Sequence, residues 1–234
     1  MDYKDFIAGQ TEQNFWFRGK KDLINVLMNK VKGKILKILD IGAGTGIDLK
    51  ILNKYGDVYV IDINQKALDL IPENLYIEKK LCDVRNLSYP DEYFDVVCSF
   101  DVFEHIEDDF KAVSEVRRVL KKGGYLVFTV PAFQFIFSSH DKALNHFRRY
   151  SEITILNLLR NFKKIKISYW NSLLFLPVSL MRIMKKRSEP KLDFFNLPNL
   201  LEKIFVRLLK IENRLINSGF KLPFGLSLVG YCIK

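Results

Sequence analysis

The stretch ILKILDIGAGTG, residues 35–46, joins a short apolar segment to three closely spaced glycines. The apolar run at residues 35–41 has the length and composition of a buried strand. Gly42, Gly44 and Gly46 allow a tight turn and let the backbone approach a bound ligand. We therefore predict a strand, a ligand-binding turn and a helix at residues 47–54.

Strands and helices alternate on both sides of this stretch. Helices are expected at residues 15–30, 65–70 and 108–122, the last ended by Gly123 and Gly124, and another is expected to begin after Ser151. Further strands are expected at residues 58–61, 75–81, 94–100, 125–130, 165–169 and 226–233. This alternation predicts an α/β fold with a largely parallel sheet and helices on both of its faces.

The 234-residue chain is 48% hydrophobic and 27% charged, which is typical of a globular protein and excludes disorder, collagen and coiled coil. Cys82, Cys98 and Cys232 are too few and too scattered for a disulfide framework or a zinc site, so a reducing compartment and no metal are expected. The N-terminus lacks the pattern of a signal peptide, and no uncharged run reaches about 18 residues. A cytoplasmic protein is expected.

The formal net charge of +10 lies entirely in the last third of the chain. Residues 1–150 contain 22 Lys and Arg and 22 Asp and Glu, whereas residues 151–234 contain 15 and 5. A basic region of this kind predicts contact with an anionic partner. Lipid headgroups, a phosphorylated substrate and nucleic acid are the candidates, and a solvated basic face is the plainer alternative.

Acidic residues mark the first three predicted strands. Asp62 closes the second strand and Asp83 follows the third, at the same carboxyl edge as the glycines that follow Asp40. Asp62 can accept hydrogen bonds from both hydroxyls of a ribose, and Asp83 can accept one from the amine of a purine. Ile47 stands where a dinucleotide motif has its last glycine, and three acids would repel a pyrophosphate. The pattern favours an adenosine that carries a sulfonium or an amine.

At these positions the chain resembles the class I S-adenosylmethionine-dependent methyltransferases. The resemblance covers about residues 35–170 and rests on residues 39–46, 60–62, 82–84, 94–97, 101–106 and 115–124. The last two segments are similar to those of small-molecule and lipid-pathway methyltransferases. The resemblance implies an enzyme with a Rossmann-like, doubly wound sheet of seven strands, the last antiparallel, and S-adenosylmethionine as its cofactor.

The resemblance also implies which residues hold that cofactor. The two glycines Gly42 and Gly44 would contact its methionine part, Asp62 its ribose and Asp83 its adenine. His105 would border the methyl-transfer side, or alternatively it only orients its own loop. The implied cofactor residues are Asp40, Gly42, Ala43, Gly44, Thr45, Gly46, Asp62, Ile63, Asp83, Val84, Phe100, Asp101 and His105.

Two further segments carry candidates for the acceptor side. Residues 14–18, NFWFR, can form an aromatic lid whose Arg18 pairs with the carboxylate of the cofactor, or else a helix that packs on the sheet. Residues 139–150, SHDKALNHFRRY, offer histidines that can take a proton and arginines that can hold a phosphate or carboxylate. Alternatively, the histidines are surface residues and the arginines form salt bridges to the next helix. Because methyl transfer needs little beyond in-line placement, such groups either position the acceptor or catalyse. The predicted catalytic residues are His140, Asp141 and His146, and the predicted acceptor-binding residues are Trp16, Arg148, Arg149 and Tyr150.

Residues 171–223 are too many for a simple connection and are expected to form a helical insertion. Its apolar stripe is Leu201, Ile204, Phe205, Leu208, Ile211 and Leu215, preceded by Phe194 and Phe195 and flanked by clustered Lys and Arg. Interfacial membrane helices combine these features; alternatively, the stripe packs inward as a cap over the site. We expect a single domain with a helical lid at residues 1–34, a cofactor-binding core at 35–170, the insertion at 171–223 and a final strand at 224–234.

These features predict a methyltransferase that acts on a small or lipid-linked acceptor, either wholly in the cytoplasm or peripherally at an anionic membrane surface. An RNA methyltransferase is the alternative enzyme, but long aliphatic side chains between the basic residues suit lipid better than base stacking. A methyltransferase-like module that binds without catalysis is the alternative outside enzymes. The intact glycine turn with its three acids speaks against that last interpretation.

Overall fold

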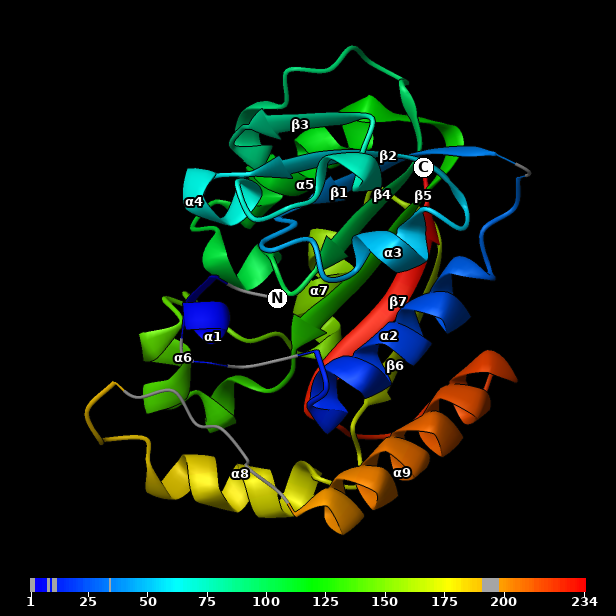
Figure 1. Ribbon diagram of the computed structural model, residues 1–234. Helices are drawn as coiled ribbons and strands as arrows, with labels where there is room; N and C mark the ends of the chain where they lie inside the picture. Colours follow the sequence, from blue (N-terminus) through cyan, green and yellow to red (C-terminus); the bar gives the residue numbers. More distant parts are fainter. Residues whose placement is uncertain (1–2, 8, 10–11, 34, 191–197) are drawn as a thin grey trace.

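Seven strands form one mixed sheet at the centre of the molecule (Figure 1). The computed structural model describes residues 3–7, 9, 12–33, 35–190 and 198–234, so Phe194 and Phe195 lie outside the described residues. The strands are β1 (Leu36–Ile41), β2 (Gly56–Asp62), β3 (Glu78–Leu81), β4 (Phe94–Phe100), β5 (Leu120–Pro131), β6 (Lys163–Trp170) and β7 (Ser227–Ile233). Their order is β3-β2-β1-β4-β5-β7-β6, and β7 runs antiparallel to both of its neighbours. The predicted Rossmann-like sheet with an antiparallel last strand is confirmed.

Helices cover both faces of this sheet (Figure 1). On one face, Val113 and Val116 of α5 (Asp109–Val119) and Ile155 of α7 (Glu152–Leu158) enter one hydrophobic core. The other face carries α2 (Phe15–Met28), α3 (Leu49–Leu52), α4 (Gln65–Leu68) and α9 (Asn199–Asn217). Near the carboxyl ends of the strands are α1 (Tyr3–Ile7), α6 (Ser139–Ala143) and α8 (Phe175–Met184), and short 3₁₀ turns occupy Glu73–Leu75, Val84–Asn86, Phe103–His105 and Gln134–Ile136.

The helix predicted at residues 108–122 begins where expected but ends earlier. Asp108 caps it by accepting a hydrogen bond from the backbone N–H of Lys111 at 2.9 Å. The helix ends at Val119 because Leu120 is fully buried and pairs with Phe94 as the first residue of β5. The two glycines after it therefore lie in the irregular start of a strand, where Gly123 has a φ of 77°. The prediction that they end the helix was wrong.

Helix α9 packs against α2 along a face that the apolar pattern does not predict. Its buried residues include Leu209 and Asn213, whereas Ile204 and Ile211 of the predicted stripe are at least 40% exposed. Gly19 permits the close approach of α2, because a Cβ at this position would lie 2.4 Å from Cδ1 of Leu209. The alternative in which the whole stripe packs inward is therefore wrong, and most of it faces outward.

The buried amide of Asn213 connects α9 to two other elements. Asn213 accepts a hydrogen bond from Nε1 of Trp170 in β6 at 2.8 Å. Its Nδ2 donates to Oδ2 of Asp22 at 2.8 Å and to the carbonyl of Gly19 at 3.1 Å, both on α2. A polar residue is needed at this position of α9 because its amide hydrogen-bonds to groups of both β6 and α2.

We expect Asn213→Ala to lower the free energy of unfolding by about 2–4 kcal/mol, because it leaves the buried indole N–H of Trp170 without a partner and removes the hydrogen bonds to Gly19 and Asp22. Denaturant titration followed by tryptophan fluorescence measures this change. The control Lys210→Ala, on the exposed face of α9, should shift the value by no more than about 0.5 kcal/mol. Equal effects of the two substitutions would contradict the role of Asn213.

Candidate active site

A cavity of about 900 Å³ opens at the carboxyl ends of the parallel strands. Open α/β sheets bind their ligands at this edge. Loops after β1 to β4 line one side of the cavity, and α2, the α6 region and α8 line the rest. The sequence-predicted residues that line it are Trp16, Gly42, Gly44, Asp62, Ile63, Asp83, Val84, Phe100, Asp101, His105, His140, His146 and Arg149.

The glycine turn after β1 is held by the carboxylate of Asp62 at the end of β2. Oδ2 of Asp62 accepts a hydrogen bond from the backbone N–H of Gly44, and Oδ1 accepts one from Asn64, each at 2.8 Å. Gly42 and Gly44 have φ values of 62° and 54°, in the left-handed region that favours glycine. The turn thereby presents bare backbone to the cavity. The same turn also contains Ala43, Thr45 and Gly46, but these three predicted cofactor residues are not among those that line the cavity.

Asp40 lies beneath this turn rather than in the lining of the cavity. Its side chain is only 3% exposed. Burial and the nearby carboxylate of Asp48 raise the pKa of Asp40 well above its usual range. The prediction that Asp40 contacts the cofactor therefore does not fit its place outside the lining of the cavity.

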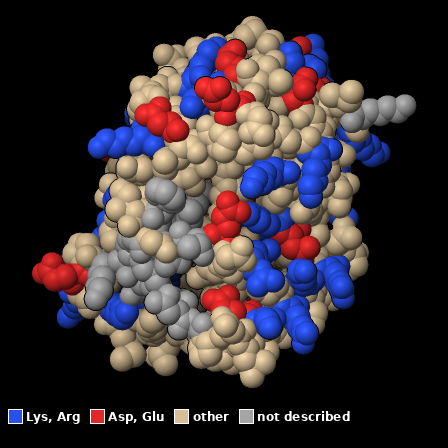
Figure 2. All heavy atoms as spheres, in the orientation of Figure 1, with Lys and Arg blue, Asp and Glu red and all other residues tan. Residues whose placement is uncertain are grey.

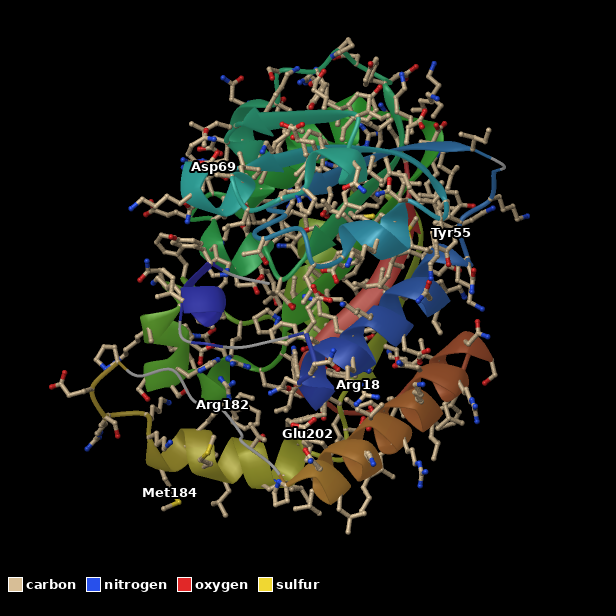
Figure 3. All side chains as sticks on the ribbon, viewed as in Figure 1. Arg18, Tyr55, Asp69, Arg182, Met184 and Glu202 are labelled. Atoms are coloured by element: carbon tan, nitrogen blue, oxygen red, sulfur yellow. The ribbon has the colours of Figure 1, made fainter. Side chains whose placement is uncertain are left out.

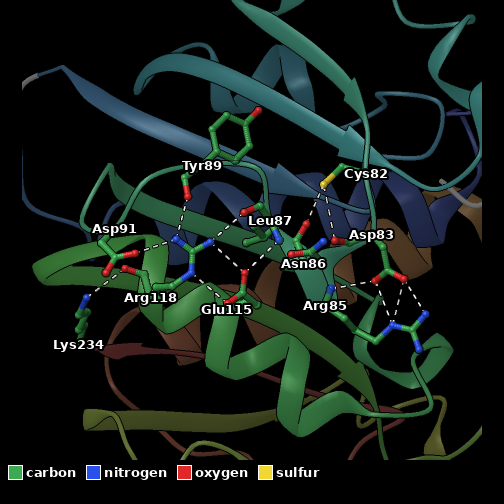
Figure 4. Close-up of polar contacts among 10 residues, drawn as sticks. All are labelled: Cys82, Asp83, Arg85, Asn86, Leu87, Tyr89, Asp91, Glu115, Arg118 and Lys234. Carbon is green, nitrogen blue, oxygen red and sulfur yellow. Dashed lines mark hydrogen bonds and ion pairs between the residues drawn. The ribbon is translucent and has the colours of Figure 1, made fainter.

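Asp83 is held in place by Arg85, two residues further along (Figure 4). Its Oδ1 accepts a hydrogen bond from the backbone N–H of Arg85 at 2.8 Å, and Nη2 of Arg85 lies 2.6 Å from its Oδ2. These contacts lower the pKa of Asp83, so its carboxylate remains charged at the cavity edge. Arg118 of α5 donates to the carbonyl of Leu87 at 2.8 Å and fixes the segment that follows (Figure 4).

The cation that α2 places in the cavity is Lys20, whereas Arg18 is exposed and is not among the lining residues. Nζ of Lys20 lies 2.6 Å from Oδ2 of Asp101, whose Oδ1 accepts a hydrogen bond from Thr129 at 2.9 Å. Helical spacing signals this arrangement, because Lys20 follows the lining residue Trp16 by four positions and so shares its face. Sequence reasoning missed Lys20 by choosing the arginine next to the aromatic residues.

Asp141, a predicted catalytic residue that does not itself line the cavity, is the centre of a buried charge cluster whose other members do. It is fully buried, and its carboxylate contacts Nδ1 of His146 at 3.0 Å, Nε of Arg149 at 2.7 Å and Nη1 of Arg182 at 3.3 Å. Although burial alone would raise it, these three partners hold the pKa of Asp141 well below its usual range. Because Arg182 belongs to α8, Asp141 joins the insertion to the site, and Figure 3 shows Arg182 on the inner side of that helix.

Two predicted acceptor residues serve the fold instead of lining the cavity. Nη1 of Arg148 lies 2.7 Å from Oδ2 of Asp109, and the hydroxyl of Tyr150 donates to the same oxygen at 2.7 Å. Together they fasten the loop after α6 to the start of α5. The alternative prediction was that the arginines of this segment form salt bridges to the next helix. Arg148 does form a salt bridge to a helix, but that helix is α5, which precedes the segment.

The remaining wall combines one titratable residue with apolar side chains. His140 lines the cavity, and burial together with the charge of Arg182 lowers the pKa of His140 to about 3, so its imidazole is neutral. Val178 of α8 and Leu174, which directly precedes that helix, line the same cavity. Trp16 packs edge-on against Trp170 with ring centroids 5.1 Å apart. This half of the cavity therefore accommodates a molecule with a polar group and an apolar body.

Glu104, which sequence reasoning did not select, lines the cavity between its two halves. The residue is fully buried, and neither carboxylate oxygen has a hydrogen-bond partner among the described residues. Burial and the charge of Asp101 raise the pKa of Glu104 well above its usual range. The sequence offers one indication that Glu104 belongs to the site, which is its place next to His105 directly after β4. That its carboxylate is buried without a hydrogen-bond partner cannot be inferred from the sequence.

Residues 39–128 match the family model of the methyltransferase domain. The chain is 28% identical over 151 residues to a probable S-adenosylmethionine-dependent methyltransferase of Mycolicibacterium smegmatis. This alignment covers 60% of this chain and 55% of that protein. The chain is 37% identical over 97 residues to the ubiquinone/menaquinone biosynthesis C-methyltransferase UbiE of Burkholderia mallei, covering 38% and 40%. The chain thus spans about half the length of these curated relatives.

Two solved structures share the fold. One is a SAM-dependent methyltransferase from Archaeoglobus fulgidus, with a TM-score of 0.58, 19% identity and coverage of 94% of this chain and 99% of that one. The other is the Haemonchus contortus phosphoethanolamine N-methyltransferase 2 in complex with S-adenosylhomocysteine, with a TM-score of 0.61, 17% identity and coverage of 92% and 52%. With the sheet order and the glycine turn, these similarities show that the chain has the fold of the class I S-adenosylmethionine-dependent methyltransferases, with a match to the methyltransferase domain at residues 39–128.

Proposed function

We propose that the protein transfers the methyl group of S-adenosylmethionine to a small or lipid-linked acceptor, which it meets at a membrane surface. The observation that carries the proposal is one cavity with two chemically distinct halves. One half is bounded by the glycine turn and carboxylates, and the other by histidines, Arg149 and the apolar side of α8.

The first half suits a cofactor that carries an adenosine and a sulfonium. The backbone at Gly42 and Gly44 approaches its methionine part, and Lys20 supplies the cation for its carboxylate. Both oxygens of Asp62 already accept one backbone hydrogen bond each and retain lone pairs for the ribose hydroxyls. Asp83 stands at the adenine end. When bound, the cofactor supplies a methyl group whose bond to sulfur is already activated by the positive charge.

The second half suits the acceptor. His140, His146 and Arg149 meet its polar group, while Asp141 orients His146 through Nδ1. The apolar body lies along Val178 of α8 and along Leu174, which directly precedes that helix. Because transfer requires mainly that the acceptor atom lie in line with the methyl–sulfur bond, these groups contribute chiefly by placing that atom.

The outer side of the insertion supports the membrane part of the proposal. The α8–α9 surface consists of the exposed apolar residues Leu176, Leu180, Met184, Leu200, Ile204 and Ile211. Basic residues Lys203, Arg207, Lys210 and Arg214 lie beside them on α9, and Figure 2 shows blue side chains gathered where Figure 1 places this helix. Apolar side chains beside Lys and Arg favour an anionic bilayer interface. None of the described helices is long and apolar enough to cross a bilayer.

The same helix borders both the cavity and this surface. Val178 lines the cavity, whereas Leu176 and Met184 are about three-quarters exposed, and Figure 3 shows Met184 pointing away from the molecule. An acceptor with an apolar tail can therefore pass from the bilayer along α8 without crossing open water. This continuity favours a lipid-linked acceptor over RNA, for which the surface offers few aromatic stacking partners.

We expect Asp62→Asn to raise the dissociation constant for S-adenosylhomocysteine by at least about 20-fold, because it removes a charged acceptor from both the ribose and the glycine turn. Isothermal titration calorimetry measures the change. Asp57→Asn, at the exposed start of β2, is the matched control and should bind as the unchanged protein does. Unchanged affinity in Asp62→Asn would contradict the ribose assignment.

The double substitution Leu176→Glu with Met184→Glu is expected to reduce binding to anionic phosphatidylglycerol vesicles at least tenfold, since two charges replace apolar contacts at the interface. Vesicle co-sedimentation at low salt reports the bound fraction. Ile153→Glu places a charge on an equally exposed apolar position of α7 and should leave binding unchanged. If the unaltered protein stays in the supernatant, the membrane part of the proposal fails.

A further inference from the structure

Three side chains bring metal-ligating atoms together on the wall of the cavity. Glu104, His105 and His146 each offer one such atom, and these atoms all lie within 4.8 Å of one another. Two of the residues come from the 3₁₀ turn Phe103–His105 after β4, and the third from the loop after α6. The backbone N–H of Phe147 donates to the carbonyl of Glu104 at 2.8 Å and locks these two segments together. The cluster is therefore set by the fold.

Glu104 supplies the strongest indication that something binds here. Its side chain is fully buried, it lines the cavity, and both of its carboxylate oxygens lack a hydrogen-bond partner among the described residues. Buried polar groups are nearly always satisfied, and a buried carboxylate without a partner costs several kcal/mol. A cation bound between Glu104 and the histidines removes that cost.

The nearest positively charged side chains do not fill this role. Lys20 pairs with Asp101 at 2.6 Å, and Arg149 pairs with Asp141 at 2.7 Å, so each is already balanced by a carboxylate. Because these carboxylates neutralise Lys20 and Arg149, the two cations would not repel a divalent ion bound beside Glu104. The carboxylate of Asp101 further favours a positive charge near Glu104.

His146 is arranged as a metal ligand usually is. Its Nδ1 lies 3.0 Å from Oδ1 of Asp141, which fixes the tautomer with the proton on Nδ1 and leaves Nε2 as the coordinating atom. Its ring meets that of His105 edge-on, with centroids 4.6 Å apart. A carboxylate that orients a ligating histidine is the common support for metal sites.

We propose that Glu104, His105 and His146 bind one divalent transition-metal ion whose open coordination position faces the cavity. Two imidazoles with one carboxylate form the ligand set of catalytic zinc sites that keep a fourth position for water or substrate. Donor atoms about 2.1 Å from an ion stand about 3.4 Å apart in a tetrahedron, so rotation of these side chains closes the site. The spacing of two adjacent residues and one 41 positions later is not a zinc-finger pattern, and from the sequence alone no metal is expected.

The role of the ion in transfer rests on the proposed function. An acceptor hydroxyl that coordinates the open position loses its proton more readily, and the proton leaves to bulk water. A lone pair of the resulting oxyanion forms the new oxygen–carbon bond while the carbon–sulfur bond breaks and its electron pair returns to sulfur. The products are a methyl ether and neutral S-adenosylhomocysteine. The site thus favours O-methylation.

Cobalt(II) titration of the chelator-treated protein tests the site without relying on activity. We expect one Co²⁺ per chain with visible ligand-field absorption, displaced by Zn²⁺. Glu104→Gln and His146→Gln should each weaken binding at least 100-fold, whereas His140→Gln, which alters the third histidine in the cavity, should leave it unchanged. Thermal denaturation of each variant establishes that it is folded.

Absence of stoichiometric Co²⁺ binding, or binding that Glu104→Gln leaves intact, would overturn the metal site. S-adenosylhomocysteine binding, measured on the same samples, separates this result from failure of the proposed function. Metal binding lost with the nucleoside ligand still bound contradicts the ion alone, whereas a folded protein that binds no S-adenosylhomocysteine contradicts the methyltransferase proposal.

Discussion

The carboxylate of Asp62 accepts hydrogen bonds from the backbone of Gly44 and of Asn64, and this pair of contacts fixes the edge on which the site is built. It holds the turn after β1 against the end of β2, with Gly42 and Gly44 in a left-handed conformation. The neighbouring loops are fastened by similar charge-assisted bonds. Arg85 holds Asp83, and Lys20 holds Asp101. This edge of the cavity is consequently held in place by carboxylates that also line the cavity.

The acceptor side depends on a second carboxylate, Asp141, which binds His146, Arg149 and Arg182 in the interior. These contacts place the charged groups of three segments at one point and connect α8 to the core. Arg182 is thereby paired in the interior, whereas the basic residues of α9 lie on its outer surface (Figure 2). Helix α8 thus borders the cavity through Val178, while exposed apolar and basic side chains cover the outer sides of α8 and α9.

The sequence was sufficient for most of the sheet and for the residues at the strand ends, because buried parallel strands are apolar runs and Asp62 and Asp83 follow two of them directly. It was insufficient wherever long-range packing decides. The burial of Leu120 in β5 ends a helix that local pattern extends to residue 122. Asn213 turns a polar position of α9 inward through hydrogen bonds, which reverses the apparent apolar face. The meeting of Glu104 with His146 likewise requires the folded chain.

Incubation with S-adenosylmethionine labelled in its methyl group, followed by fractionation of a cell extract, tests the central claim most directly. The account predicts label in the lipid or small-molecule fraction, lost in Asp62→Asn and retained in Asp57→Asn. Label that appears in RNA would contradict the acceptor class and reassign the basic surface of α9. The extract should contain the membranes of the cells from which it is made. If the protein binds S-adenosylmethionine but no fraction of this extract gains label, the claim that it methylates a small or lipid-linked acceptor is contradicted.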